Sequence, residues 1–339
     1  MTLIKTVARK IIFPVIIRTG LEAFLSKGTK NKHLILMYHG VVNKVNTNLS
    51  VNHISKSDFE KQLSYLQKHF NVVSLSEIFE SYRLQQQPSE LTIAITFDDG
   101  YENNYINAFP LLKKYNLPAT IFVAAQCLQD NSAILWYDFI DLFKSEINLE
   151  ALNMSEIQLG NEKLEALKKI KSLSQLKTFF KTLNTLEKKS ITDVLIAKDK
   201  VETLKQRSDK EFWKMLNAKQ MKEMSDSRLI EIGSHSVTHP NLDTLNKADL
   251  ENELKVSKHL LEEVISKEVI SIAYPDGAYN EEVKDVSLKI GYKNLLAVDY
   301  RTGTDSSDKN ILPRFCISNT TTMESNMISL HRSFSKIGF

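Results

Sequence analysis

This 339-residue sequence contains few cysteines and few glycines, and neither positive nor negative charge is in large excess. Its two cysteines, Cys127 and Cys316, lie far apart, so they imply no disulfide framework and slightly favour a reducing compartment. The 44 basic and 41 acidic residues leave a net charge of only +3, which argues against a nucleic-acid-binding protein. With 42% apolar and 25% charged residues, the composition excludes a largely disordered or fibrous chain.

Glycine accounts for only 10 of the 339 residues, whereas about 7% is usual. Each glycine is therefore expected where the backbone requires one. Four of them fall at or near the ends of apolar runs of β type, namely Gly40, Gly100, Gly233 and Gly277. Active-site loops of open α/β sheets and of (β/α) barrels occupy such positions.

The N-terminal segment, residues 1–32, contains no apolar run long enough to cross a membrane. Its apolar core, residues 11–17, includes Pro14 and is followed by Arg18, whereas a spanning helix needs about 20 apolar residues. A signal peptide would require a small-residue cleavage site that does not follow at the right distance. The main alternatives are a helix packed on the domain's own surface and an amphipathic helix on a membrane whose anionic headgroups would face Lys5, Arg9, Lys10 and Arg18, with a signal peptide or anchor as the third.

From residue 33 the sequence alternates between strand and helix patterns. A capping box at residues 57–60 predicts the start of one helix, and residues 103–115 and 247–266 predict two others. Apolar, β-branched runs predict strands at 33–42, 91–97, 119–125, 229–233, 269–273 and 295–298. This alternation favours a parallel sheet with helical crossovers.

Residues from about 140 to 222 interrupt this alternation. They are rich in Lys, Leu and Glu, contain one glycine and no proline, and space their apolar residues as helices do. We therefore expect one domain at 33–339 that is interrupted by a helical insertion. The lysines of the insertion predict a solvated face, with a patch for an anionic substrate or a membrane as the alternative.

Three polar motifs each follow a predicted strand directly: TFDDG at 96–100, HSVTHP at 235–240 and AYPDGAY at 273–279. Two histidines four residues apart can share one face of a helical turn, and an aspartate from another strand end can complete a metal site with open positions. Of two adjacent aspartates, one can bind the metal while the other takes a proton from water. Each motif alone is weak evidence, but their order and their places at strand ends favour a catalytic metal site.

These motifs resemble those of the polysaccharide deacetylases of the NodB-homology type, carbohydrate esterase family 4, over residues 33–130 and 211–339. The resemblance implies a distorted (β/α) barrel with a helical insertion, and an enzyme that removes N-acetyl or O-acetyl groups from sugars. It makes Asp98 the catalytic base. It also assigns the ligands of a divalent metal, usually zinc, to Asp99, His235 and His239.

The third motif departs from the family pattern. Ala273 stands where an arginine would orient the base, and we expect Arg314 to replace it, a surface arginine being the alternative. Asp276 stands at an aromatic position of the family whose backbone N–H contributes to the oxyanion hole. That contribution survives a change of side chain.

The family's general acid has no clear match in this sequence. His331 lies in the right part of the chain for this role, and His39, at the end of the first strand, is another candidate for the site. Residues 136–138 resemble a subgroup that acts on exopolysaccharide or lipid-linked sugars, and they line either the substrate cleft or the core.

The sequence thus predicts a metal-dependent sugar deacetylase that acts on a cell-surface polysaccharide or its lipid-linked precursor. The alternatives are a hydrolase of another non-peptide C–N bond and an inactive carbohydrate-binding relative. The expected location is cytoplasmic, at the inner face of the membrane. An acetylated amino sugar is the expected partner, with peripheral membrane contact through the N-terminus and no nucleic acid.

Overall fold

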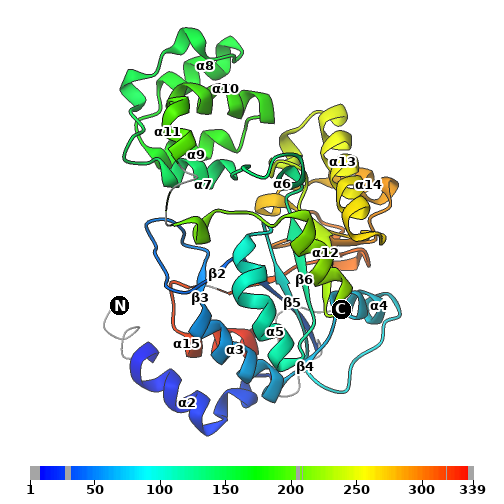
Figure 1. Ribbon diagram of the computed structural model, residues 1–339. Helices are drawn as coiled ribbons and strands as arrows, with labels where there is room; N and C mark the ends of the chain where they lie inside the picture. The colour runs from blue at the N-terminus through cyan, green and yellow to red at the C-terminus, as the bar shows by residue number, and fades with distance from the viewer. Residues whose placement is uncertain (1–7, 27–31, 204–206, 208, 318, 335–339) are drawn as a thin grey trace.

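A nine-stranded, wholly parallel sheet forms the centre of the computed structural model, which describes residues 8–26, 32–203, 207, 209–317 and 319–334 (Figure 1). In spatial order its strands are β10 (Ile311–Leu312), β9 (Asn294–Leu296), β8 (Ser271–Ala273), β7 (Ile230–Ser234), β6 (Ala119–Val123), β5 (Thr92–Phe97), β1 (His33–Tyr38) and β11 (Phe315–Cys316), with β4 (Asn71–Val72) also paired to β5. Every residue of β1, β5 and β6 is buried, as expected for strands of a barrel whose inner face is filled by side chains and whose outer face is covered by helices. The predicted α/β barrel is confirmed.

The two edge strands of this sheet are consecutive in the chain. β10 ends at Leu312 and pairs with β9, whereas β11 begins at Phe315 and pairs with β1 at the opposite edge. Only Pro313 and Arg314 join them. The sheet therefore curls until its edges nearly meet, and Arg314 lies at the seam.

Helices surround the barrel and cover the sheet (Figure 1). They are α3 (Lys56–His69), α4 (Leu75–Arg83), α5 (Phe109–Tyr115), α12 (Ala218–Asp226), α13 (Lys247–Ile265), α14 (Glu281–Ile290) and α15 (Met323–Ser333). Shorter elements are β2 (Val41–Val42), β3 (Ile54–Ser55), α6 (Gln126–Gln129), η3 (Asn104–Ala108), η8 (Leu242–Thr244), η9 (Pro275–Gly277) and η10 (Asp305–Ser307).

The first barrel helix begins earlier than the sequence pattern indicated. The N-cap of α3 is Ser55, whose side chain accepts a hydrogen bond from the backbone N–H of Asp58, so the expected capping box at 57–60 is wrong. A complete capping box instead starts α4, where Ser74 and Glu77 bond reciprocally. The sequences at 57–60 and 74–77 both place a glutamate three residues after a serine, so only the backbone geometry shows which of them forms a capping box.

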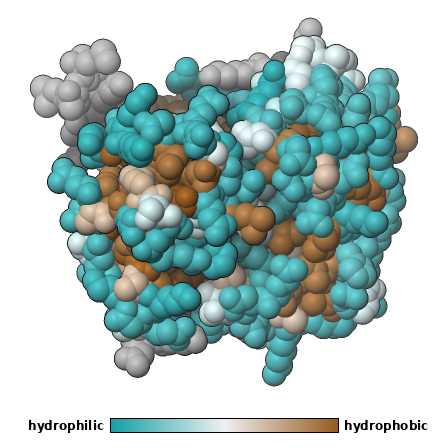
Figure 2. Space-filling view, turned by 90° about the horizontal axis from the view of Figure 1, so that it is seen from above, coloured by the Kyte–Doolittle hydropathy of each residue, from teal (hydrophilic) through white to brown (hydrophobic). Residues whose placement is uncertain are grey.

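The chain between β6 and β7 forms a helical lobe, which stands apart at the top of Figure 1. Its elements are α7 (Trp136–Leu142), η4 (Leu149–Ala151), η5 (Met154–Glu156), α8 (Asn161–Lys168), α9 (Leu173–Phe180), α10 (Thr185–Leu195), α11 (Lys198–Glu202) and η7 (Lys210–Phe212). The lobe has its own core, which includes Trp136, Phe180 and Trp213. The following helix, α12, packs against β7 and α13 of the barrel. Viewed from above, hydrophilic residues border the apolar areas of the surface (Figure 2).

The N-terminal segment lies at the other end of the molecule, beside α15 (Figure 1). It comprises η1 (Ala8–Ile12), α2 (Phe13–Thr19) and η2 (Leu21–Ser26). Among the residues described, no helix combines the length and the apolar character that crossing a membrane requires. Of the expected headgroup contacts, Lys5 lies outside the described residues, as do the side chains of Arg9 and Lys10.

Candidate metal centre and active-site cleft

The three sequence motifs meet at one edge of the barrel. Because all strands are parallel, the loops that follow β5, β7 and β8 share the carboxyl edge of the sheet. They line a cleft of about 380 Å³, to which the loop after β1 also contributes His39. The arrangement predicted from the strand-end positions of the motifs is therefore present.

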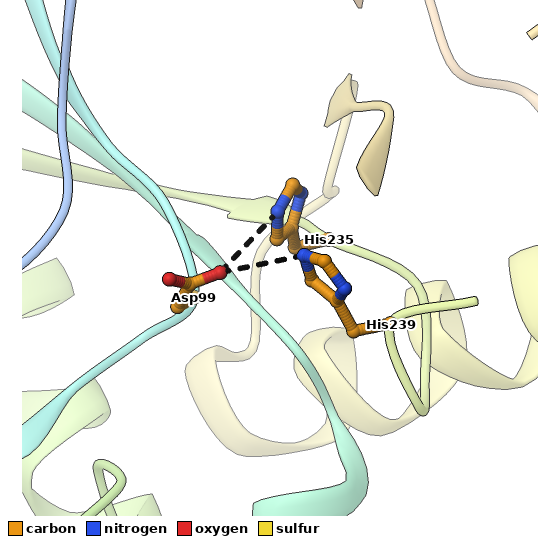
Figure 3. A group of neighbouring side chains, drawn as sticks. All are labelled: Asp99, His235 and His239. Atoms are coloured by element: carbon orange, nitrogen blue, oxygen red, sulfur yellow. Dashed lines mark ion pairs between the residues drawn. The ribbon is translucent and has the colours of Figure 1, made fainter. Parts of the chain in front are cut away.

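Asp99, His235 and His239 form a buried cluster (Figure 3). Asp99 Oδ1 lies 3.6 Å from His235 Nε2 and 3.5 Å from His239 Nε2. All three ligand atoms lie within 4.8 Å of one another. One carboxylate and two imidazoles on one side of a cleft form a donor set suited to zinc or a similar divalent cation, with positions left for water and substrate.

The protonation states of this cluster also suit a cation. His235 Nδ1 donates a hydrogen bond to the carbonyl of Ala273 at 2.7 Å, which leaves the Nε2 lone pair directed at the site. Burial, with His235 nearby, lowers the pKa of His239 well below its ordinary value, so its imidazole is neutral. Asp99 Oδ2 is buried and has no hydrogen-bond partner within the described part of the chain. A cation would compensate this buried carboxylate.

The two histidines belong to a bent loop and not to the helical turn expected from their spacing. Ser236 and His239 adopt φ values of 63° and 56°, in the left-handed region. The buried carboxylate of Glu253, on α13, accepts hydrogen bonds from the backbone N–H groups of Val237 and Thr238 at 2.8 and 3.0 Å. Glu253 thus fixes the loop that presents both imidazoles. No motif in the sequence indicated this role.

Asp98 and Arg314 form a buried, two-point ion pair next to this cluster. Arg314 Nη1 and Nη2 donate to the two carboxylate oxygens of Asp98 at 2.6 and 2.8 Å. Burial acts to raise the pKa of Asp98, but the guanidinium and His235 outweigh it and hold the pKa below its ordinary value. Arg314 therefore contacts the carboxylate that, in the family pattern, an arginine at the position of Ala273 would orient.

Asp276 lines the same cleft from the loop after β8. Its backbone is left-handed, with a φ of 53°. Its carboxylate lies 3.2 Å from the ammonium of Lys181, which follows α9 of the lobe. This ion pair joins the barrel and the lobe beside the loops that carry the sequence motifs.

His331 does not lie with the other predicted site residues. It is buried in α15, its Nε2 is 3.0 Å from the hydroxyl of Tyr65 on α3, and its ring lies against Phe70. Because α15 turns this face towards α3, the proton-donor role expected of His331 does not fit its position. His39 is the remaining histidine candidate from the sequence, and it lines the cleft together with Asp98 and Asp99.

Residues 136–138, on α7, line the cleft and also contribute to the core of the lobe. Trp136 Nε1 donates to the carbonyl of His239 at 3.1 Å, and the ring of Tyr137 lies 5.2 Å from the His239 ring. Tyr101 donates to Asp138 at 2.8 Å. Burial and the charge of Asp99 raise the pKa of Asp138 well above its ordinary value.

The lobe also brings two lysines to the cleft, Lys177 and Lys181. Lys177 pairs with Asp141 at 2.6 Å. The sequence pattern offered only a general patch of lysines here, because their partners lie in distant parts of the chain.

Comparison with known proteins gives consistent results. The sequence model described as polysaccharide deacetylase matches residues 85–295. Bacillus subtilis YxkH is 24% identical over 278 residues, which cover 82% of this chain and 67% of that protein. The poly-β-1,6-N-acetyl-D-glucosamine N-deacetylase of Staphylococcus aureus is 23% identical over 273 residues, covering 78% of this chain and 68% of its own. The solved structure of the Streptococcus pyogenes deacetylase PplD, in complex with acetate, superposes with a TM-score of 0.57 at 20% identity, covering 88% of this chain and 97% of that one.

Proposed function

The chain belongs to the polysaccharide deacetylase family, and we propose that it removes N-acetyl groups from a polymer of N-acetylglucosamine with the help of a divalent metal, zinc above all. One observation carries the proposal: a buried carboxylate, Asp98, is held ionised by Arg314 directly beside the Asp99, His235 and His239 cluster. Pure sugar binding would need no ionised base at a metal site. The name of the staphylococcal relative supports the choice of sugar.

Asp99, His235 and His239 would hold the metal, which when bound would polarise the acetyl carbonyl and acidify a water molecule. Asp98 accepts the proton of the attacking water at a carboxylate oxygen. A carboxylate with a lowered pKa is a weak base, but it is ionised at any working pH and both its oxygens are oriented by Arg314. The backbone N–H of Asp276 contributes to stabilising the developing oxyanion.

His39 donates the proton that the departing sugar amine requires. It follows β1 directly and lines the cleft on the side of Asp98 and Asp99. An amine is a poor leaving group unless protonated, so a donor within the cleft is needed. Among the histidines considered from the sequence, His331 is excluded from this role by its contact with Tyr65.

The test combines metal analysis with acetate release from N-acetylglucosamine oligomers. Wild type should contain stoichiometric metal and release acetate. Asp98→Asn should retain the metal and lose about 10²–10⁴-fold in rate, and His39→Gln should also be slowed. His331→Gln serves as the matched control and should keep the wild-type rate.

Each other result has a definite meaning. Stoichiometric metal without acetate release would replace the enzymatic proposal with a carbohydrate-binding role. Protein without metal, although His235 and His239 are intact, would refute the mechanism. A slow His331→Gln variant beside a normal His39→Gln variant would reverse the assignment of the proton donor.

A further inference from the structure

Large apolar side chains are exposed at one place in particular. Among the described residues, six of the eleven large apolar side chains that the structure exposes fall between residues 11 and 25, and the other five are scattered over the rest of the chain. The six, with their exposed fractions, are Ile11 (61%), Ile12 (47%), Val15 (53%), Leu21 (51%), Phe24 (64%) and Leu25 (40%). Concentration of this kind marks an interaction surface, whereas single exposed apolar residues need no explanation.

This segment is nevertheless anchored to the barrel. Ile17 packs against the main core, and α2 and η2 lie against α15. Glu22 is completely buried and accepts a hydrogen bond from the Tyr65 hydroxyl at 2.8 Å. The segment is thus packed against the barrel while its exposed apolar residues face outwards. Within α2 itself, no residue is fully buried.

The charges of the segment select one kind of partner. Residues 1–32 contain seven lysines and arginines and a single acidic residue, Glu22. That carboxylate is turned inwards onto Tyr65, whereas Arg18, at the end of α2, is exposed. Exposed apolar side chains in a segment whose sequence is basic complement a bilayer surface that carries anionic headgroups.

We propose that residues 11–25 dock the protein on the surface of an anionic phospholipid bilayer, with the apolar side chains at the headgroup boundary. The segment lies on the bilayer and does not cross it, since α2 has only 7 residues and a span needs about 20. The helical lobe lies at the opposite end of the molecule (Figure 1). Docking therefore leaves the cleft, which the lobe lines, open to a polymer.

The test is co-sedimentation of the full chain with phosphatidylcholine vesicles that contain or lack phosphatidylglycerol. Wild type should sediment with the anionic vesicles, far less with the neutral ones, and less as salt is raised. Val15→Asp and Phe24→Asp should each weaken binding about tenfold or more, because each removes buried apolar area from the docked state. Leu186→Asp is the matched control, since Leu186 is 78% exposed but lies on α10 of the lobe, and it should bind as wild type does.

Folding and activity are measured on the same samples. Thermal unfolding and acetate release from soluble oligomers should be the same in all four proteins, so loss of vesicle binding and failure of the proposed function are separate results. Wild type that ignores anionic vesicles, or a Val15→Asp variant that still binds them, would overturn the proposal. A wild-type dimer that Val15→Asp converts to monomers, without vesicle binding, would show that a second copy covers this surface instead.

Discussion

Lys188 is a buried cation whose replacement should stabilise the protein. It lies on α10 of the lobe, is only 6% exposed, and its ammonium has no hydrogen-bond partner in the described residues. Its nearest favourable contact is the ring of Trp136, whose centroid is 5.0 Å from Nζ. Burial lowers the pKa of Lys188 from 10.5 to about 8, although the carboxylates of Glu253 and Asp276 act against this.

The size of the effect follows from linkage. The drop from 10.5 to about 8, at about 1.4 kcal/mol per pH unit, amounts to about 3 kcal/mol of destabilisation when the lysine is charged. The cation–π contact with Trp136 offsets about 1–2 kcal/mol of this destabilisation. Methionine fills nearly the same volume without a charge, so Lys188→Met should raise the free energy of unfolding at pH 7 by about 1–2 kcal/mol.

The pH dependence has a defined sign. The folded protein holds its proton on Lys188 more weakly than the unfolded chain does, so the penalty is fully present below pH 8 and disappears as the pH rises to 10.5. Urea unfolding of wild type and variant at several pH values measures the difference. The advantage of Lys188→Met should shrink by about 1.4 kcal/mol per pH unit above pH 8.

The neighbouring lysine provides the control. Lys189 pairs with Asp193 at 2.8 Å, and its side chain is 68% exposed, so Lys189→Met should change stability by less than about 0.5 kcal/mol. A Lys188→Met protein that is less stable than wild type at pH 7 would refute the reasoning. An advantage that does not vary with pH would show that packing, and not charge, produced it.

Three other substitutions test the barrel and the site. Arg314→Met should lower the free energy of unfolding by about 3–5 kcal/mol in urea, because it leaves the Asp98 carboxylate buried without its partner; a smaller loss would mean that water replaces the guanidinium. Burial lowers the pKa of His53 from 6.5 to about 3, so His53 stays neutral in the folded protein at pH values where the unfolded chain binds a proton. The free energy of unfolding of the wild type should therefore fall as the pH drops below 6.5. In His53→Gln the free energy of unfolding should fall less steeply with decreasing pH, by about 1.4 kcal/mol per pH unit, in acid titrations monitored by circular dichroism. Gly100→Ala should destabilise by about 1–3 kcal/mol in thermal unfolding, because Gly100 has a φ of 81° and a Cβ would lie 2.8 Å from Val123 Cγ1.

The predictions of the fold and of the metal site depended mainly on the motifs at the strand ends. The alternation of strand and helix patterns indicated the parallel sheet, and the strand-end positions of the motifs indicated that they meet at one edge. The resemblance to a known family supplied the barrel and the assignment of Asp99, His235 and His239 as metal ligands. Arg314 could be predicted for a related reason. Arg314 follows the last predicted strand region and a guanidinium can hold a carboxylate at two points, but the sequence left a surface arginine as an equal alternative, and the structure places Arg314 between β10 and β11 against Asp98.

The remaining errors concern contacts that depend on the packing of distant segments. His331 was chosen by its place near the end of the chain, but the direction of a residue on α15 is set by how that helix packs against α3. Glu253 lies 16 residues after Val237 and on another element, so no spacing rule connects the two. The start of α3 was misplaced by a similar ambiguity, because two serines of equal chemistry precede Asp58 and only the backbone conformation selects Ser55.

The position of the helical lobe explains why it contributes to the cleft. The lobe follows β6 and α6 and precedes α12 and β7, so it is an enlarged connection from the carboxyl end of one strand to the next. Every such connection of a parallel barrel begins at the edge where the catalytic loops lie. The insertion must therefore border the site, as α7 and Lys181 do. The loops after β5, β7 and β8 supply the metal cluster and Asp98, whereas the lobe supplies one wall of the cleft.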